Sequence, residues 1–170
     1  MLAETQAYLE TLEELRSQVG NMIKDLPPDG LNWRPSLPPG ADGTNSLAVL
    51  AVHVAGSEHG WIAETVGAYP QTRVRDDEFK YVATSADEAL NRLVAVAKET
   101  NDVLGKFTTN QLEGTIDKDD RALPMRWVIH HVIYHYSLHI GHMQLTYQLW
   151  NKGMAATSPR WFDRLPKKAN

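Results

Sequence analysis

Apolar side chains recur at helical spacing along four long stretches of the chain. In the first stretch Leu12, Leu15, Val19 and Met22 follow one another at steps of three and four residues, which places them on one side of a helix. The same kind of periodicity continues between turn-rich segments. It predicts four helices and a short tail, with these approximate bounds: 2–26, 46–67, 85–107 and 124–152, then 153–170.

Residues that start and stop helices support these bounds. Asn45 or Ser46 can cap the second helix, and the Ser85-x-x-Glu88 pattern is typical of a capping box before the third. Pro124 suits the first turn of the fourth helix, and Gly153 can terminate it. Together the periodicity and the caps favour an all-α fold, a four-helix bundle.

The connections are rich in residues that favour turns. Residues 27–44 and 108–123 are predicted loops, the second with a short extended piece near 115–116, and nothing in the sequence forms a convincing strand pattern. Trp161 and Phe162 could dock the tail against the bundle. We find no internal repeat and no low-complexity tract, so we expect one domain over the whole chain.

The composition excludes several classes of protein. Seventeen Lys and Arg against 21 Asp and Glu give a net charge of −4, so a nucleic-acid partner is not expected. No stretch approaches about 18 consecutive apolar residues, which argues against a membrane span. The opening MLAETQAYLETLEEL lacks the features of a secretory signal, and we expect a cytoplasmic protein. Zero cysteines exclude thiolate metal sites, so any metal must bind nitrogen and oxygen.

Histidines are concentrated in the fourth predicted helix. Five of the seven fall within the segment IHHVIYHYSLHIGH, and four of these lie within about 80° of one another on one face: His131, His135, His139 and His142. Residues four apart on a helix have Cβ atoms about 5–6 Å apart, so two imidazoles can converge on one ion. The pairs 131/135 and 135/139 are equally suitable. A solvated polar face or a pH-sensitive interface would account for the same pattern.

A third ligand has to come from another helix, and His53 is the candidate. Its ring lies within the apolar run LAVLAVHVAG, where a polar group is costly to bury unless it is hydrogen-bonded or ligated. A satisfied core histidine is the alternative explanation. His59, turned about 240° from His53, cannot share its face.

The segments NSLAVLAVHVAGSEHGWIAETVGAY and WVIHHVIYHYSLHIGHMQLTYQLW together resemble the DinB/YfiT-like superfamily of small metal-binding four-helix proteins. The resemblance extends over most of residues 25–150. It implies a bundle in up-down-down-up order, one divalent metal ion held by three histidines and, commonly, a homodimer. Carried over position by position, the metal ligands are His53, His135 and His139. Position 135 varies among the relatives, with a carboxylate in some subgroups.

The chemistry of such a site guides the functional expectation. Three neutral imidazoles leave at least one coordination position open, as in catalytic sites, and zinc or nickel is the expected ion. Several members of the resembled superfamily are thiol-dependent transferases or isomerases that use a low-molecular-weight thiol such as mycothiol or bacillithiol. We therefore expect a metal-dependent enzyme that activates a thiol for transfer to, or isomerisation of, an electrophilic small molecule. The alternatives are a metal-dependent hydrolase, for which no base is evident, and a non-catalytic, stress-associated metal-binding dimer.

Further side chains could support the site. Ser57 lies one turn beyond His53, His131 could hold a ligand ring in place, and His142 could orient the substrate or bond across a dimer. Three arginines in the predicted connections could clamp an anionic thiol cosubstrate: Arg34, Arg73 and Arg75.

Overall fold

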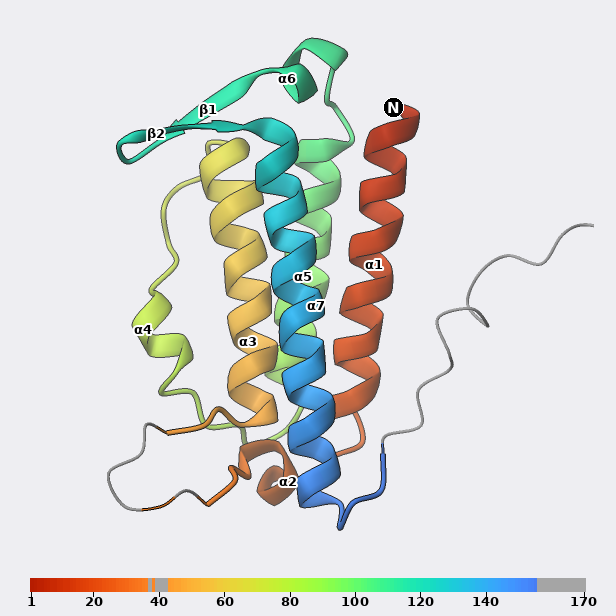
Figure 1. Ribbon diagram of the computed structural model, residues 1–170, viewed down its shortest axis with the longest axis vertical. Helices are drawn as coiled ribbons and strands as arrows, with labels where there is room; N and C mark the ends of the chain where they lie inside the picture. Colours follow the sequence, from red (N-terminus) through yellow and green to blue (C-terminus); the bar gives the residue numbers. More distant parts are fainter. Residues whose placement is uncertain (37, 39–42, 156–170) are drawn as a thin grey trace, which may run out of the picture.

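Four long helical segments lie side by side and form the body of the protein (Figure 1). The computed structural model describes residues 1–36, 38 and 43–155, so the predicted docking of Trp161 and Phe162 lies outside the described residues. The long segments are α1 (Ala3–Ile23), α3 (Leu47–Glu58) continued by the π-helix η1 (His59–Val66), α5 (Asp87–Leu104) and α7 (Met125–Trp150). The shorter elements are α2 (Pro28–Asn32), α4 (Arg75–Glu78), α6 (Thr109–Glu113), β1 (Thr115–Lys118) and β2 (Arg121–Pro124). The mostly helical fold expected from the sequence is confirmed.

The core lies between the apolar faces of these helices. Leu12, Leu15 and Val19 of α1 are buried, as their spacing predicted. In α3 every residue over 47–55 is buried, because a helix that is apolar all round has to be covered on all sides. His53 therefore lies in the most enclosed helix of the fold. Within the described ranges, no helix is both long and apolar enough to cross a membrane.

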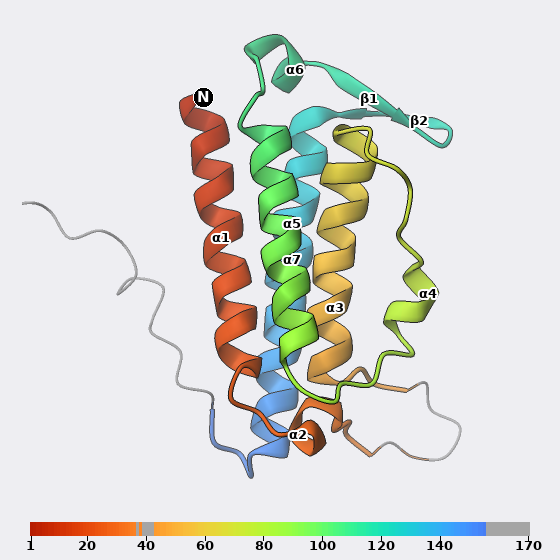
Figure 2. The same ribbon diagram turned by 180° about the vertical axis from the view of Figure 1, so that it is seen from behind.

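Contacts between the helices establish their directions. The N-terminal turns of α1 and α7 meet where the Arg126 guanidinium donates to Glu4 at 2.6 Å. The η1 segment lies beside the N-terminal part of α7, since the rings of Trp61 and Trp127 are 6.0 Å apart. In Figure 1, α1 and α7 run downwards while α3 and α5 run upwards, and Figure 2 shows the same pairing from behind.

One buried carboxylate joins all four long segments. Glu58, the last residue of α3, is fully buried. It accepts hydrogen bonds from Arg16 of α1 at 2.5 Å, Thr100 of α5 at 2.6 Å and Tyr136 of α7 at 2.8 Å. Burial raises the pKa of Glu58, and the three donors oppose this effect because they stabilise the charged carboxylate. The network aligns the helices, because an unpaired charge at this depth would cost several kcal/mol.

The connections hold more structure than the sequence predicted. The expected loop over 27–44 begins with α2, where a Cβ on Gly30 would come within 2.7 Å of the Trp150 ring. Glycine is therefore needed for α2 to pack against the end of α7. In the connection between η1 and α5, the segment 75–78 forms α4, which was also missed.

The sequence predicts no convincing strand, only a short extended piece near 115–116, whereas the structure forms two short strands there. Region 108–123 contains α6 and the antiparallel pair β1–β2, whose register runs from Thr115↔Pro124 to Lys118↔Arg121. Each strand has only four residues and no buried position, so it lacks the apolar alternation that reveals longer strands. The expected extended piece at 115–116 is part of β1.

Helix bounds agree with the predicted ones to within a few residues, with two differences in detail. Ser46 does cap α3 by accepting the N–H of Val49 at 3.3 Å. The second helix is not α-helical to its end, because it continues as η1 after Glu58. The predicted capping box is absent: α5 begins at Asp87, whose N–H donates to Ser85, while Glu88 pairs with a later residue of α5, Arg92.

We predict that Glu58→Gln lowers the free energy of unfolding by about 3 kcal/mol or more, because glutamine removes the buried counter-charge of Arg16 and leaves only the exposed Glu13 to pair with it. Urea unfolding measures the loss. Glu13→Gln is the matched control, since Glu13 also pairs with Arg16 but is 64% exposed, and it should cost no more than about 1 kcal/mol. Equal losses in the two variants would contradict a central role for Glu58.

Candidate metal centre

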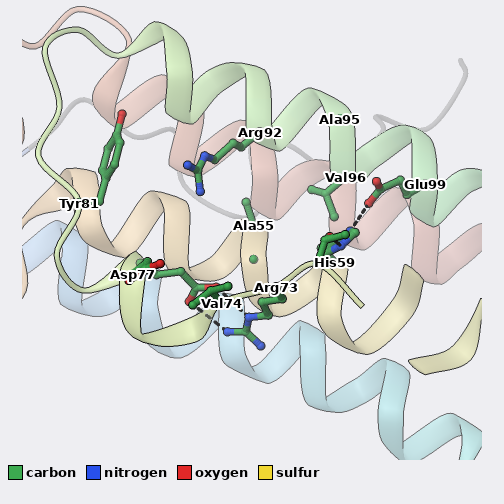
Figure 3. Close-up of a pocket in the computed structure, with 13 residues that line it drawn as sticks. Ala55, His59, Arg73, Val74, Asp77, Tyr81, Arg92, Ala95, Val96 and Glu99 are labelled. Carbon is green, nitrogen blue, oxygen red and sulfur yellow. Dashed lines mark hydrogen bonds and ion pairs between the residues drawn. The ribbon is translucent and has the colours of Figure 1, made fainter. Parts of the chain in front are cut away.

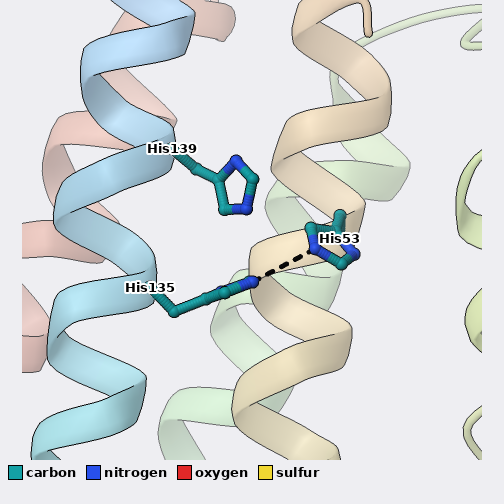
Figure 4. Close-up of side chains that lie close together, drawn as sticks. All are labelled: His53, His135 and His139. Atoms are coloured by element: carbon teal, nitrogen blue, oxygen red, sulfur yellow. Dashed lines mark hydrogen bonds between the residues drawn. The ribbon is translucent and has the colours of Figure 1, made fainter. Parts of the chain in front are cut away.

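Three histidines from two helices converge on one point (Figure 4). His53 comes from α3, and His135 and His139 come from successive turns of α7. One ring nitrogen from each of the three lies within 4.8 Å of the other two. Nε2 of His53 and Nε2 of His135 are 3.1 Å apart. Of the two pairs that the sequence left open, the structure brings 135/139 to His53.

Burial keeps the two rings of α7 neutral. Desolvation, reinforced by the neighbouring imidazoles, lowers the pKa of His135 to about 3 and that of His139 to about 4. Metal binds the neutral form of imidazole, so no proton has to be displaced from these two rings at pH 7.

The tautomer of His53 follows from its partner. Its Nδ1 lies 2.7 Å from Oε2 of Glu78. A carboxylate only accepts hydrogen bonds, so Nδ1 carries the proton and donates it. The lone pair of His53 is then on Nε2, which is the atom that faces His135.

The arrangement of nitrogens fits a divalent transition-metal ion. Nδ1 of His135 is buried and has no hydrogen-bond partner among the described residues. If Nε2 of His135 donated to His53, this Nδ1 would be left as an unpaired acceptor; with the other tautomer, two lone pairs would face each other. A cation between the rings removes the repulsion between the two lone pairs; Nδ1 of His135 is then protonated and still has no acceptor in the part of the chain that the structure describes. Tetrahedral zinc with bonds of about 2.0–2.1 Å places its ligand nitrogens about 3.3–3.4 Å apart, close to the spacing of His53 and His135.

The three predicted supporting residues differ in their relation to the cluster. His142 is exposed, and its Nδ1 lies 3.4 Å from Nδ1 of His139. The ring of His131 lies 6.1 Å from that of His135 and also packs against Trp61 and Trp127, with ring centroids 5.0 Å away in both cases; burial lowers the pKa of His131. Ser57 is buried one turn beyond His53.

Sequence reasoning missed Glu78. This side chain of α4 is 5% exposed and accepts two hydrogen bonds from Arg73, at 2.7 and 3.1 Å, besides the one from His53. Burial acts to raise the pKa of Glu78, but the donors outweigh it and hold the pKa below its ordinary value. The guanidinium of Arg73 is therefore engaged, which argues against the expected clamp on an anionic cosubstrate.

The other two proposed clamp residues also have partners within the chain. Arg34 donates to the backbone carbonyls of Thr44 and Phe79, and the guanidinium of Arg75 lies 4.8 Å from the centre of the Phe79 ring. Neither contact includes a residue of the histidine cluster.

The remaining histidines point to other partners. His59 contacts Glu99 at 2.7 Å and Thr72 at 3.0 Å, on a different side of the helix from His53, as predicted. His130 lies 3.4 Å from the hydroxyl of Tyr8 on α1. Neither belongs to the cluster.

Known proteins provide an independent comparison. Residues 11–143 match the model of the DinB superfamily. A conserved protein of Enterococcus faecalis has a similar structure, with a TM-score of 0.68 at 17% identity over 88% of this chain and 98% of that one. A DinB-like protein of Bacillus cereus has the same TM-score at 18% identity, over 91% of this chain and 97% of that one. No curated protein matches. The match over most of the chain means that this protein belongs to the DinB superfamily.

Proposed function

We propose that this protein is a divalent-metal-dependent enzyme that transfers a low-molecular-weight thiol to an electrophilic small molecule, or isomerises such a molecule with the help of the thiol. His53, His135 and His139 would hold the ion, zinc or nickel. The observation that carries the proposal is the convergence of three imidazole nitrogens within 4.8 Å of one another, from α3 and α7.

The donor set supports a catalytic rather than a structural ion. Structural zinc sites are closed by four protein ligands, whereas catalytic sites have three and keep a position open. The cluster in the described part of the chain has three, and Glu78 is already engaged by His53 and Arg73. His135 and His139 are only partly buried, so small molecules can approach from the side of α7.

The absence of cysteine supports a thiol that arrives with a cosubstrate. An ion bound at the cluster would act as a Lewis acid that lowers the pKa of a coordinated thiol and so raises its nucleophilicity. The chain itself would hold the neutral imidazoles in place and exclude water from the His53 side of the site.

A homodimer in the cytoplasm belongs to the same proposal. Four large apolar side chains on α7 are more than half exposed, and such a stripe supports a partner surface: Tyr134, Leu138, Leu145 and Leu149. The outer face of α7 is thus suited to a second copy of the chain.

We predict about one equivalent of zinc or nickel per chain in the wild-type protein and almost none in His53→Ala, because two ligands on one helix do not close the site. Elemental analysis of protein purified without an affinity tag measures both. His130→Ala, also on α7 but in contact with Tyr8, is the matched control and should retain the metal. A wild-type protein that takes up neither ion would disprove the metal site.

We also predict that the metal-loaded protein consumes a thiol in the presence of an electrophile. Bacillithiol, mycothiol and glutathione, each with chlorodinitrobenzene, serve as probes, and loss of free thiol is the readout. His139→Ala should remain folded by circular dichroism but lose turnover. Turnover of esters or amides without thiol would favour a hydrolase instead. Collapse of the fold in His139→Ala would favour a structural ion.

A further inference from the structure

We propose that Glu78, braced by Arg73, is a positioning residue that fixes His53 with Nδ1 protonated and Nε2 directed at the metal position. The inference rests on the proposed metal site and adds to it a residue outside the ligand set. His53 then meets the ion through a nitrogen whose orientation is set before any ion arrives.

The hydrogen bonds of Glu78 define its orientation completely. Oε2 accepts from Nδ1 of His53 at 2.7 Å and from Arg73 at 3.1 Å, while Oε1 accepts from Nε of Arg73 at 2.7 Å. Both oxygens are engaged, and the two-point contact with a planar guanidinium prevents the carboxylate from rotating away. The fixed carboxylate in turn fixes the orientation of the His53 ring through its hydrogen bond to Nδ1.

Two glycines on the helix make room for this pair. A Cβ on Gly56 would lie 2.1 Å from Oε1 of Glu78, and one on Gly60 would lie 2.9 Å from Cδ of Arg73. Any other residue at position 56 would push the carboxylate off α3. Gly56 and Gly60, one helical turn apart, therefore leave the space on the helix surface that Glu78 and Arg73 occupy beside His53.

The connection that carries the pair is itself fastened to the bundle. Glu64 of η1 accepts the backbone N–H groups of Thr72 and Arg73. Phe79, next to Glu78, packs on the His53 ring with centroids 4.8 Å apart. Arg73 and Glu78 both line a pocket of about 410 Å³ between α3, α5 and residues 72–81. Figure 3 shows Arg73 among the residues that line it.

The chemical effect of such a carboxylate is known in general terms. Histidine ligands commonly donate their second N–H to a carboxylate, which fixes the tautomer and makes the ligating nitrogen more basic. Without it, the Nε2-protonated tautomer of His53 would compete, and an ion would have to displace that proton. Loss of such a partner typically weakens metal binding by about 10- to 100-fold.

The first test is zinc affinity, measured by competition with a chelator. Glu78→Ala should raise the Kd for zinc by about 10- to 100-fold while the stoichiometry at saturation stays at one. Glu78→Gln keeps an acceptor oxygen and should raise the Kd for zinc less than Glu78→Ala does. Gly56→Ala removes no polar group, yet its Cβ displaces the carboxylate, so its Kd should also rise. Gly141→Ala is the matched control, because a Cβ there meets nothing within 4 Å although His139 is two residues away.

The second test needs no metal. Nitrogen-15 NMR of the metal-free wild-type protein should show His53 protonated at Nδ1, and Gly56→Ala and Glu78→Ala should shift it towards the Nε2-protonated form. A wild-type His53 protonated at Nε2, or unchanged zinc affinity in both Glu78→Ala and Gly56→Ala, would overturn the proposal. If the wild-type protein binds no zinc, the proposed metal-dependent function is disproved. The NMR measurement of the His53 tautomer still tests separately whether Glu78 positions His53.

Discussion

The buried carboxylate of Glu58 determines how the long helices lie against one another. It accepts hydrogen bonds from side chains of α1, α5 and α7 at the end of α3, and it is fully buried. Tyr136, its partner on α7, is the neighbour of His135, and His53 lies five residues before Glu58. The contact that aligns α3 with α7 therefore also sets where the histidines meet.

The three histidines of the cluster differ in burial and in their hydrogen bonds. His53 is buried in α3 and donates a hydrogen bond to Glu78, whereas His135 and His139 on α7 are only partly buried. Burial of the α7 rings favours their neutral, ligating form. An ion bound between α3 and α7 would be held by the buried His53 on the inner side. Its open coordination position would be reached on the partly exposed side of His135 and His139, as an exchangeable ligand requires. The chain belongs to the DinB superfamily, but family membership does not identify the reaction. The reaction depends on which small molecules reach the open coordination position.

Periodicity in the sequence predicted the long helices because each buries a continuous apolar face. The histidines of α7 and the isolated His53 also stood out, since polar rings on apolar helices are unusual. Glu58 and Glu78 did not stand out, because an acidic residue usually indicates a solvent-exposed position. The partners of Glu58 are 42 and 78 residues away, and His53 is 25 residues from Glu78; Arg73, five residues from Glu78, is the one nearby partner. The helix changes to π-helix after Glu58, where η1 packs against α5 and α7, and no local sequence pattern indicated this change. The strands were too short to recognise.

X-ray absorption spectroscopy of the zinc-loaded protein tests the central claim most directly, because it counts imidazoles around the ion. We expect three histidine nitrogens at about 2.0–2.1 Å together with a light, exchangeable ligand. Addition of a thiol should replace that ligand with sulfur at about 2.3 Å. Two or fewer imidazoles, or a closed shell that a thiol does not change, would contradict an open three-histidine centre between α3 and α7.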